Sequence, residues 1–170
     1  MNSHHVASRL LLIPALALLL PACSGWKPQE SETLAQEASQ TVTRFTQRDP
    51  GLQRFFDDAY GYAVFPTVGK GAIGVGGAYG KGVVYEKGNA IGTTKMVQVT
   101  IGFQWGGQAY SELVFFENKA ALERFKNGNL EFSAQASAVA ITLGASATAD
   151  YENGVAVFTM AKGGLMYEAS

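Results

Sequence analysis

Reactive side chains are scarce in this chain. Its 170 residues include one cysteine, Cys23, and two histidines, His4 and His5. Only 16% of the residues are charged and the formal net charge is −1, so the chain lacks the basic excess with which proteins bind nucleic acid. Because 47% of the residues are hydrophobic, the composition also excludes disorder for most of the chain, since disorder accompanies low hydrophobicity and high net charge.

Long apolar runs are missing as well. Leu10–Leu20 is apolar, but it is shorter than the roughly 20 residues that a membrane-spanning helix needs. It follows Arg9 and ends in Leu-Pro-Ala-Cys, a pattern typical of a secretory signal and similar to the bacterial lipobox, in which the cysteine is acylated. We predict a lipoprotein signal peptide over residues 1–22, a tether over residues 23–31 and lipidation at Cys23 with fatty acids such as palmitate. A plain signal peptide with an incidental cysteine is the alternative.

These features predict a location and exclude several chemistries. Ser24 follows the cysteine, which by the same resemblance predicts anchoring in the outer membrane, facing the periplasm or the cell surface. Removal of residues 1–22 leaves no histidine and no free thiol. Catalysis by Ser-His-Asp or Cys-His groups, zinc bound by His or Cys, and disulfides are then excluded. Only carboxylate, lysine, tyrosine or serine chemistry stays available to an enzyme, which is the alternative. We expect a protein without enzymatic activity, cofactor or metal.

Two regions follow the tether. Residues 32–58 are predicted to be helical, because Leu34, Ala38, Val42 and Phe45 form one apolar stripe along Glu32–Gln47. Asp49 and Pro50 are typical of a helix start and predict a second helix over Pro50–Ala59. We expect the stripe to pack on a sheet, whereas lying on a membrane or against a partner helix are the alternatives.

Residues 59–170 alternate in the manner of strands and are rich in glycine, which permits bulges and tight bends. The exception is a helix predicted between Asn118 and Gly128. The fold class is therefore α+β, with N-terminal helices followed by a strongly bent, mostly antiparallel sheet or partly open barrel and one further short helix. Strands are predicted at Tyr62–Phe65 (ended by Pro66), within Val68–Glu86, and at Lys95–Trp105, Ala109–Phe116, Leu130–Ala140 (central or covered on both faces), Ala145–Tyr151, Val155–Met160 and Leu165–Tyr167. Turns are predicted at Lys87-Gly88-Asn89, Gly106-Gly107 and Asn153-Gly154.

Lysine recurs directly before glycine in this region. A lysine supplies a point charge and the neighbouring backbone N–H groups form a nest, so that the two together can hold a phosphate. The same pairs would also serve as ordinary hairpin turns with solubilising lysines. The candidate headgroup-binding residues are Lys70, Gly71, Lys81, Gly82, Lys162 and Gly163, with Lys95 and Lys126 as weaker candidates.

Several of these residues fall within longer motifs. The chain resembles the SYLF-domain family, and in particular its bacterial lipoprotein branch, from about Tyr60 to Ser170. The matching segments are Ala59–Pro66, Val68–Gly71 with Gly76-Gly77, Gly80–Val84, Gly102–Gln108, Leu113–Phe116 and Ala161–Leu165. Many relatives continue through a further strand beyond the position of Ser170, so a sheet edge is expected to be exposed there.

The resemblance implies a non-enzymatic module that binds phospholipid headgroups, in particular those of phosphoinositides. Eukaryotic members also regulate actin, but their Trp-Ser-x-Pro stretch is missing near Ile91–Met96, which argues against actin as a partner. The predicted function is therefore that of a membrane-anchored lipoprotein that binds phospholipid headgroups. The alternative is a structural or surface-antigen lipoprotein of the envelope that binds host or other proteins.

Overall fold

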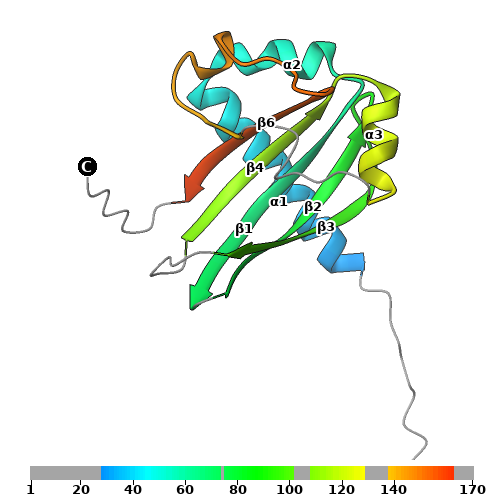
Figure 1. The fold of residues 1–170 in the computed structure, drawn as a ribbon. Coiled ribbons are helices and arrows are strands. Elements are labelled where there is room, and N and C mark those ends of the chain that lie inside the picture. The colour runs from blue at the N-terminus through cyan, green and yellow to red at the C-terminus, as the bar shows by residue number, and fades with distance from the viewer. Residues whose placement is uncertain (1–27, 74, 102–107, 129–137, 163–170) are drawn as a thin grey trace, which may run out of the picture.

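A computed structural model describes residues 28–73, 75–101, 108–128 and 138–162. Helices lie on both sides of one curved sheet (Figure 1). N-terminal helices followed by a mostly antiparallel sheet confirm the predicted α+β class. The helical elements are α1 (Pro28–Arg48), η1 (Pro50–Leu52), α2 (Gln53–Asp58), α3 (Lys119–Lys126) and η2 (Ala145–Ala147). The strands are β1 (Gly61–Ile73), β2 (Val75–Glu86), β3 (Asn89–Ile101), β4 (Gln108–Phe116), β5 (Ala138–Ala140) and β6 (Val155–Lys162).

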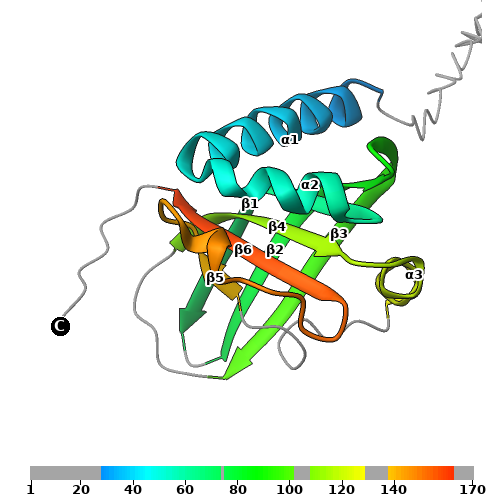
Figure 2. The ribbon, with the colours of Figure 1, turned by 90° about the horizontal axis from the view of Figure 1, so that it is seen from above.

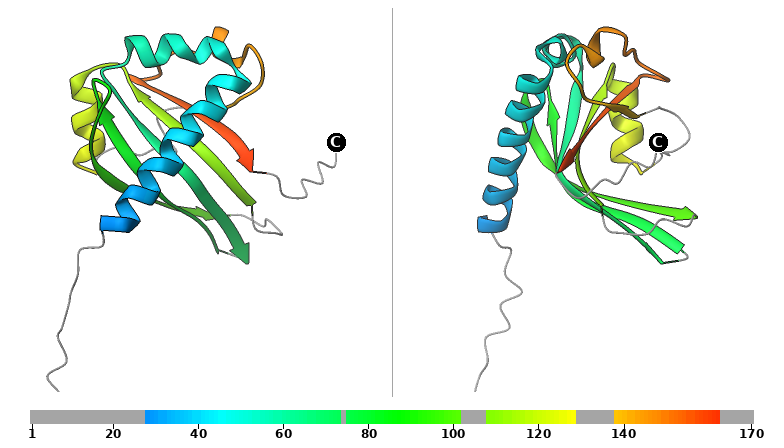
Figure 3. Two further views of the ribbon diagram at one scale, coloured as in Figure 1. Left: turned by 180° about the vertical axis from the view of Figure 1, so that it is seen from behind. Right: turned by 90° about the vertical axis from the view of Figure 1, so that its left-hand side faces the viewer.

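The strands form one six-stranded sheet in the order β3-β2-β1-β4-β6-β5. All neighbours described are antiparallel except β5 and β6. The view in the right-hand panel of Figure 3 shows that the sheet bends strongly, as predicted. The sheet stays open rather than closing into a barrel, because β3 and β5 stand at its two ends.

Helix α1 begins at Pro28, four residues earlier than the predicted Glu32. Proline suits the first turn of a helix, since its missing N–H has no partner there in any case. The predicted stripe packs on the sheet: Ala38 and Phe45 are fully buried, and Leu34 and Val42 pack beside them. Figure 2 shows α1 and α2 together on one side of the sheet.

Asp49 caps the next helical segment, as predicted, and it does more than the sequence indicates. Its carboxylate accepts a hydrogen bond from the backbone N–H of Gly51 at 3.1 Å and another from that of Ser146 at 2.7 Å. Arg54 donates to the carbonyl oxygens of Ser146 and Ala149 at 2.6 and 2.5 Å. Two side chains from the helical layer therefore hold a loop that lies almost a hundred residues further along the chain.

The structure of this loop contradicts the strand predicted at Ala145–Tyr151. Residues Ala145–Tyr151 do not form a strand; Ala145–Ala147 form the 3-10 turn η2, which follows Gly144 at φ +81°. The backbone groups of Ser146 and Ala149 bond to Asp49 and Arg54 rather than to a neighbouring strand. The sequence pattern could not reveal this, because the partners are distant side chains.

Pro66 does not end the first strand. β1 continues through it to Ile73, and the pairing with both neighbours shifts register around Phe65–Thr67. A bulge of this kind tolerates proline, because the bulged residue need not donate a ladder hydrogen bond. The carbonyl oxygen of Pro66 instead accepts a hydrogen bond from Ser111 Oγ at 2.8 Å.

The predicted strand Leu130–Ala140 lies mostly outside the described residues. Its last part forms the three-residue edge strand β5, parallel to β6. The prediction that this strand is central or doubly covered is therefore wrong for its described part, and Leu143 just beyond it is 80% exposed. The predicted Gly106-Gly107 turn and the strand Leu165–Tyr167 also lie outside the described residues.

Other local signals are confirmed. Asn118 caps α3 by accepting a hydrogen bond from the N–H of Ala121 at 3.0 Å, and Gly128 follows the helix at φ +70°. The turns at Lys87-Gly88 and Asn153-Gly154 both place two consecutive residues at positive φ, as type I′ hairpin turns require.

The core has two parts, one on each face of the sheet. On what we call the helix face, α1 and α2 cover residues such as Val64, Leu113 and Phe115. On what we call the inner face, α3 covers Phe65 and Phe116, among others. Strands β1 and β4 are buried on both faces, whereas parts of β2 and β3 remain exposed.

Gly82 is required by packing on the inner face. A Cβ atom at this position would lie 2.7 Å from Cδ1 of Phe65 and 2.8 Å from the carbonyl oxygen of Val64. We expect Gly82→Ala to lower the free energy of unfolding by about 1–3 kcal/mol through overpacking, measured by urea denaturation. Gly92→Ala is the control, because a Cβ atom there has nothing within 4 Å; equal losses in the two variants would contradict this account.

Candidate functional site

The strand register sorts the predicted lysines onto the two faces of the sheet. Side chains of directly paired residues lie on the same face, and successive residues alternate. On β2, Val83 belongs to the core of the helix face and Ala78 to the core of the inner face. Lys81 and Tyr79 are therefore on the helix face, while Gly80 and Gly82 are on the inner face.

Three of the predicted lysines come together on the helix face. Lys162 at the end of β6 donates a hydrogen bond from Nζ to Oγ1 of Thr67 on β1. Thr67 pairs with Lys81 on β2, and Lys81 pairs with Lys95 on β3. We call Lys162, Thr67, Lys81 and Lys95 the cation row.

Pairing sets the dimensions of this row. Directly paired Cα atoms of neighbouring antiparallel strands are about 5 Å apart, so the ammonium groups of Lys81 and Lys95 both reach a single phosphate placed above the sheet. Both side chains are exposed. Lys95 was the weaker candidate in the sequence, because it stands in a strand rather than before a glycine, and the register gives it a position equal to that of Lys81.

Among the three lysines of the cation row, Lys162 is the most buried, and it has charged neighbours on α1. It is half-buried, and this burial together with the nearby guanidinium of Arg44 lowers its pKa, while Glu37 acts in the opposite direction. Arg44 lies on α1 and bonds to Oγ1 of Thr41 at 2.8 Å. A second element thus contributes positive charge beside the end of the row, and an anion bound there would offset the mutual repulsion of Lys162 and Arg44.

The remaining predicted residues do not join the row. Lys70 pairs with Ala78 and so belongs to the inner face. Gly82 is buried against Phe65 on that same face. Gly71 lies in β1, where it pairs with Gly77, and Gly163 and Cys23 lie outside the described residues.

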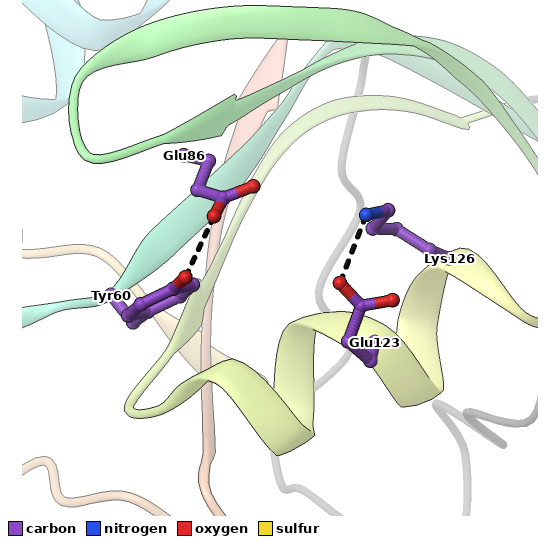
Figure 4. Close-up of polar contacts among 4 residues, drawn as sticks. All are labelled: Tyr60, Glu86, Glu123 and Lys126. Carbon is purple, nitrogen blue, oxygen red and sulfur yellow. Dashed lines mark hydrogen bonds and ion pairs between the residues drawn. The ribbon is translucent and has the colours of Figure 1, made fainter.

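Lys126 stands elsewhere, on α3. Its Nζ is 3.0 Å from Oε1 of Glu123, one turn earlier in the same helix. Figure 4 shows this pair beside the hydrogen bond that Tyr60 donates to Glu86 at 2.7 Å. The first contact lies within α3, and the second joins the residue before β1 to the end of β2. Neither involves the cation row.

An exposed apolar pair that the sequence analysis missed lies next to the row. Tyr79 is 49% exposed and Val97 is 72% exposed, and the two residues pair across β2 and β3. Each is two positions from a lysine of the row, so all four side chains are on the helix face. The alternation Tyr79, Lys81, Val83, Tyr85 contains this signal, but the sequence does not show that α1 covers Val83 and leaves Tyr79 exposed.

A buried carboxylate on β4 was missed as well. Glu112 is 3% exposed, and its Oε1 has no hydrogen-bond partner among the described residues. Burial raises its pKa to about 7, and burial together with the charge of Glu112 raises the pKa of Tyr110 to about 12. Glu112 pairs with Phe65, whose side chain is on the inner face, so this group is separate from the cation row.

Glu112 predicts a particular pH dependence of stability. Below its ordinary pKa of 4.5 it is protonated in both the folded and unfolded states, and its contribution to stability is fully present. As the pH rises from 4.5 through about 7, Glu112 loses its proton in the unfolded chain before it does so in the folded protein. The free energy of unfolding therefore falls by about 3 kcal/mol over this range. We expect Glu112→Gln to gain stability over the unsubstituted protein as the pH rises from 4.5 to 8, measured by urea denaturation. An unchanged difference across that range would contradict the raised pKa.

Two features of the described residues concern membrane-spanning helices and metal ligands. None of the described helices is sufficiently long and apolar to cross a bilayer. Within the same part of the chain, no three His, Cys, Asp or Glu residues come together as a set of metal ligands.

Comparison with known proteins finds a match to one protein family. Residues 97–169 match the family described as Ysc84, Las17-binding protein actin regulator, and this is the SYLF-domain family. The matched residues run from the second half of β3 through β4, α3 and β6. The match confirms the SYLF resemblance predicted from the sequence.

A bacterial relative extends the similarity further along the chain. Over 134 residues the chain is 29% identical to beta cell expansion factor A from Aeromonas veronii. The aligned part covers 78% of this chain and 51% of that protein, so the chain spans about half the length of this relative.

Proposed function

We propose that the protein is a lipid-anchored lipoprotein whose SYLF domain binds the phosphate groups of phospholipid headgroups without catalysis. The observation that carries this proposal is the cation row, in which Lys162, Lys81 and Lys95 from three strands line up on one face of the sheet. A row of point charges suits phosphate better than it suits a planar carboxylate, which arginine binds in bidentate fashion. Phosphoinositides carry several phosphates on one ring and so match a row of cations best.

The anchor is the second part of the proposal. It rests on Cys23 at the end of an apolar segment that follows Arg9. Acylation at one cysteine with more than one chain holds a protein stably at a membrane, since each buried CH₂ adds about 0.8 kcal/mol. The proposed location is the outer membrane, with the domain facing the periplasm or the cell surface.

The second candidate function is binding of a host protein. It is favoured by the similarity to a protein called beta cell expansion factor A, with which 78% of this chain aligns. This function predicts capture of a protein by crosslinking and no preference among lipids. Selective binding to phosphate-bearing lipids in the experiment that follows would decide against it as the main function.

The cation row is tested by charge removal. Full-length protein carrying Cys23→Ser, which prevents acylation, is incubated with phosphatidylcholine vesicles that contain or lack phosphatidylinositol 4,5-bisphosphate, and bound protein is measured by flotation. We expect selective binding, and we expect the triple variant Lys81→Ala, Lys95→Ala, Lys162→Ala to lose about 100-fold in affinity for the charged vesicles, since each lysine near a charged surface contributes about 1 kcal/mol. Binding should also weaken as salt rises.

A matched control separates the row from net charge. Lys70→Ala, Lys119→Ala and Lys126→Ala remove the same charge from the inner face and from α3. This control should keep nearly all of the affinity. Equal losses in the two triple variants would reject the row as the site, and equal binding of the unsubstituted domain to both kinds of vesicle would reject the function.

Lipidation is tested separately in cells. Cells of a Gram-negative bacterium expressing the full chain are grown with radiolabelled palmitate and separated into membrane fractions. We expect label on the protein and its recovery with the outer membrane, and we expect Cys23→Ser to abolish both. Cys23→Ser protein that remained labelled, or an unsubstituted protein that stayed unlabelled, would contradict the anchor.

A further inference from the structure

We infer that the helix face docks directly on a bilayer, with Tyr79 and Val97 entering its interfacial layer beside the cation row. This inference rests on the proposed function and adds to it the kind of surface that the site recognises. A soluble phosphate would need only the lysines. The exposed apolar pair next to them suits a surface where phosphate and hydrocarbon meet, and an anionic lipid bilayer is such a surface.

The arrangement of the four side chains carries this inference. Tyr79 pairs with Val97 and Lys81 pairs with Lys95, in two adjacent rows on one face. Tyrosine is enriched where membranes meet water, because its ring is apolar and its hydroxyl is polar. Lysines directly beside it would meet phosphates at the same depth, so the surface is complementary to a bilayer both in charge and in polarity.

Space is available above this surface. Gly69 on β1 pairs with Tyr79, and a Cβ atom at Gly69 would have nothing within 4 Å. The glycine is therefore not required by packing, unlike Gly80, where a Cβ atom would lie 2.9 Å from Val68. The absence of a side chain at Gly69 leaves the aromatic ring of Tyr79 open on that side.

The position of the proposed anchor also supports docking through the helix face. Cys23 lies five positions before Pro28, where α1 begins, and five residue steps span at most about 17 Å. The right-hand panel of Figure 3 shows that α1 begins at the lower end of the molecule, on the side of the helix face, where the strands bend away from it. An acylated Cys23 would thus hold the bilayer close to the face that carries Tyr79 and Val97.

The test separates docking from headgroup binding. Full-length protein with Cys23→Ser is compared with the same protein also carrying Tyr79→Ser and Val97→Thr, which keep the backbone preferences of exposed strand positions. The two probes are phosphatidylcholine vesicles containing phosphatidylinositol 4,5-bisphosphate, and soluble inositol 1,4,5-trisphosphate. We expect the double variant to lose about tenfold in affinity for the vesicles and to bind the soluble headgroup as the unsubstituted protein does.

Insertion itself is measured with a polarity-sensitive fluorophore. In the Cys23→Ser protein, the fluorophore is attached to Val97→Cys or, as a control, to Leu143→Cys, which is comparably exposed on a different part of the molecule. Vesicles should shift the emission of the first probe to the blue and leave that of the second unchanged.

The outcomes are distinct. Undiminished vesicle binding by the Tyr79 and Val97 variant, or no spectral shift at position 97, would overturn docking while leaving headgroup binding intact. Loss of the soluble headgroup by that variant would also overturn it, because the two residues would then act within the phosphate site. An unsubstituted protein that bound neither probe would reject the proposed function together with this inference.

Discussion

The rest of the structure depends on the burial of strands β1 and β4 on both faces. Phe115 and Leu113 face α2 and α1, while Phe116 and Val114 face the side that α3 covers. A strand that is apolar on both faces needs a cover on each, and the chain supplies α1 and α2 on one face and α3 on the other. Phe55 of α2 lies with its ring centroid 5.4 Å from that of Phe115 and 4.9 Å from that of Phe158. This aromatic contact joins the helical layer to β4 and β6.

The same constraint decides which surface is left uncovered. Helix α1 covers Val83 and Val64 but leaves Tyr79 and Val97 exposed. The cation row lies at this boundary, with Lys162 half-buried near α1 and Lys81 and Lys95 exposed. Strand β2 thus contributes Val83 to the core and Tyr79 and Lys81 to the candidate binding surface.

Much of the fold follows from local signals. Asn118, Asp49 and the two hairpin turns act through hydrogen bonds or backbone angles within a few residues, and each was placed correctly from the sequence. The predictions were wrong where residues far apart in the sequence determine the local backbone structure. Pro66 remains inside β1 because Ser111 and a bulge accommodate it, and Ala145–Ala147 form a turn because Asp49 and Arg54 bind the backbone there.

The sequence by itself determined the fold class and a resemblance: an α+β chain similar to the SYLF family, poor in reactive side chains, with lysines suited to phosphate. Composition and short motifs act through residue chemistry and local geometry, so they can be read without a structure. Only the tertiary structure decided which lysines meet. Strand pairing places Lys95 beside Lys81 and puts Lys70 on the opposite face, because side chains alternate along a strand and the register between strands is set by contacts far apart in the chain.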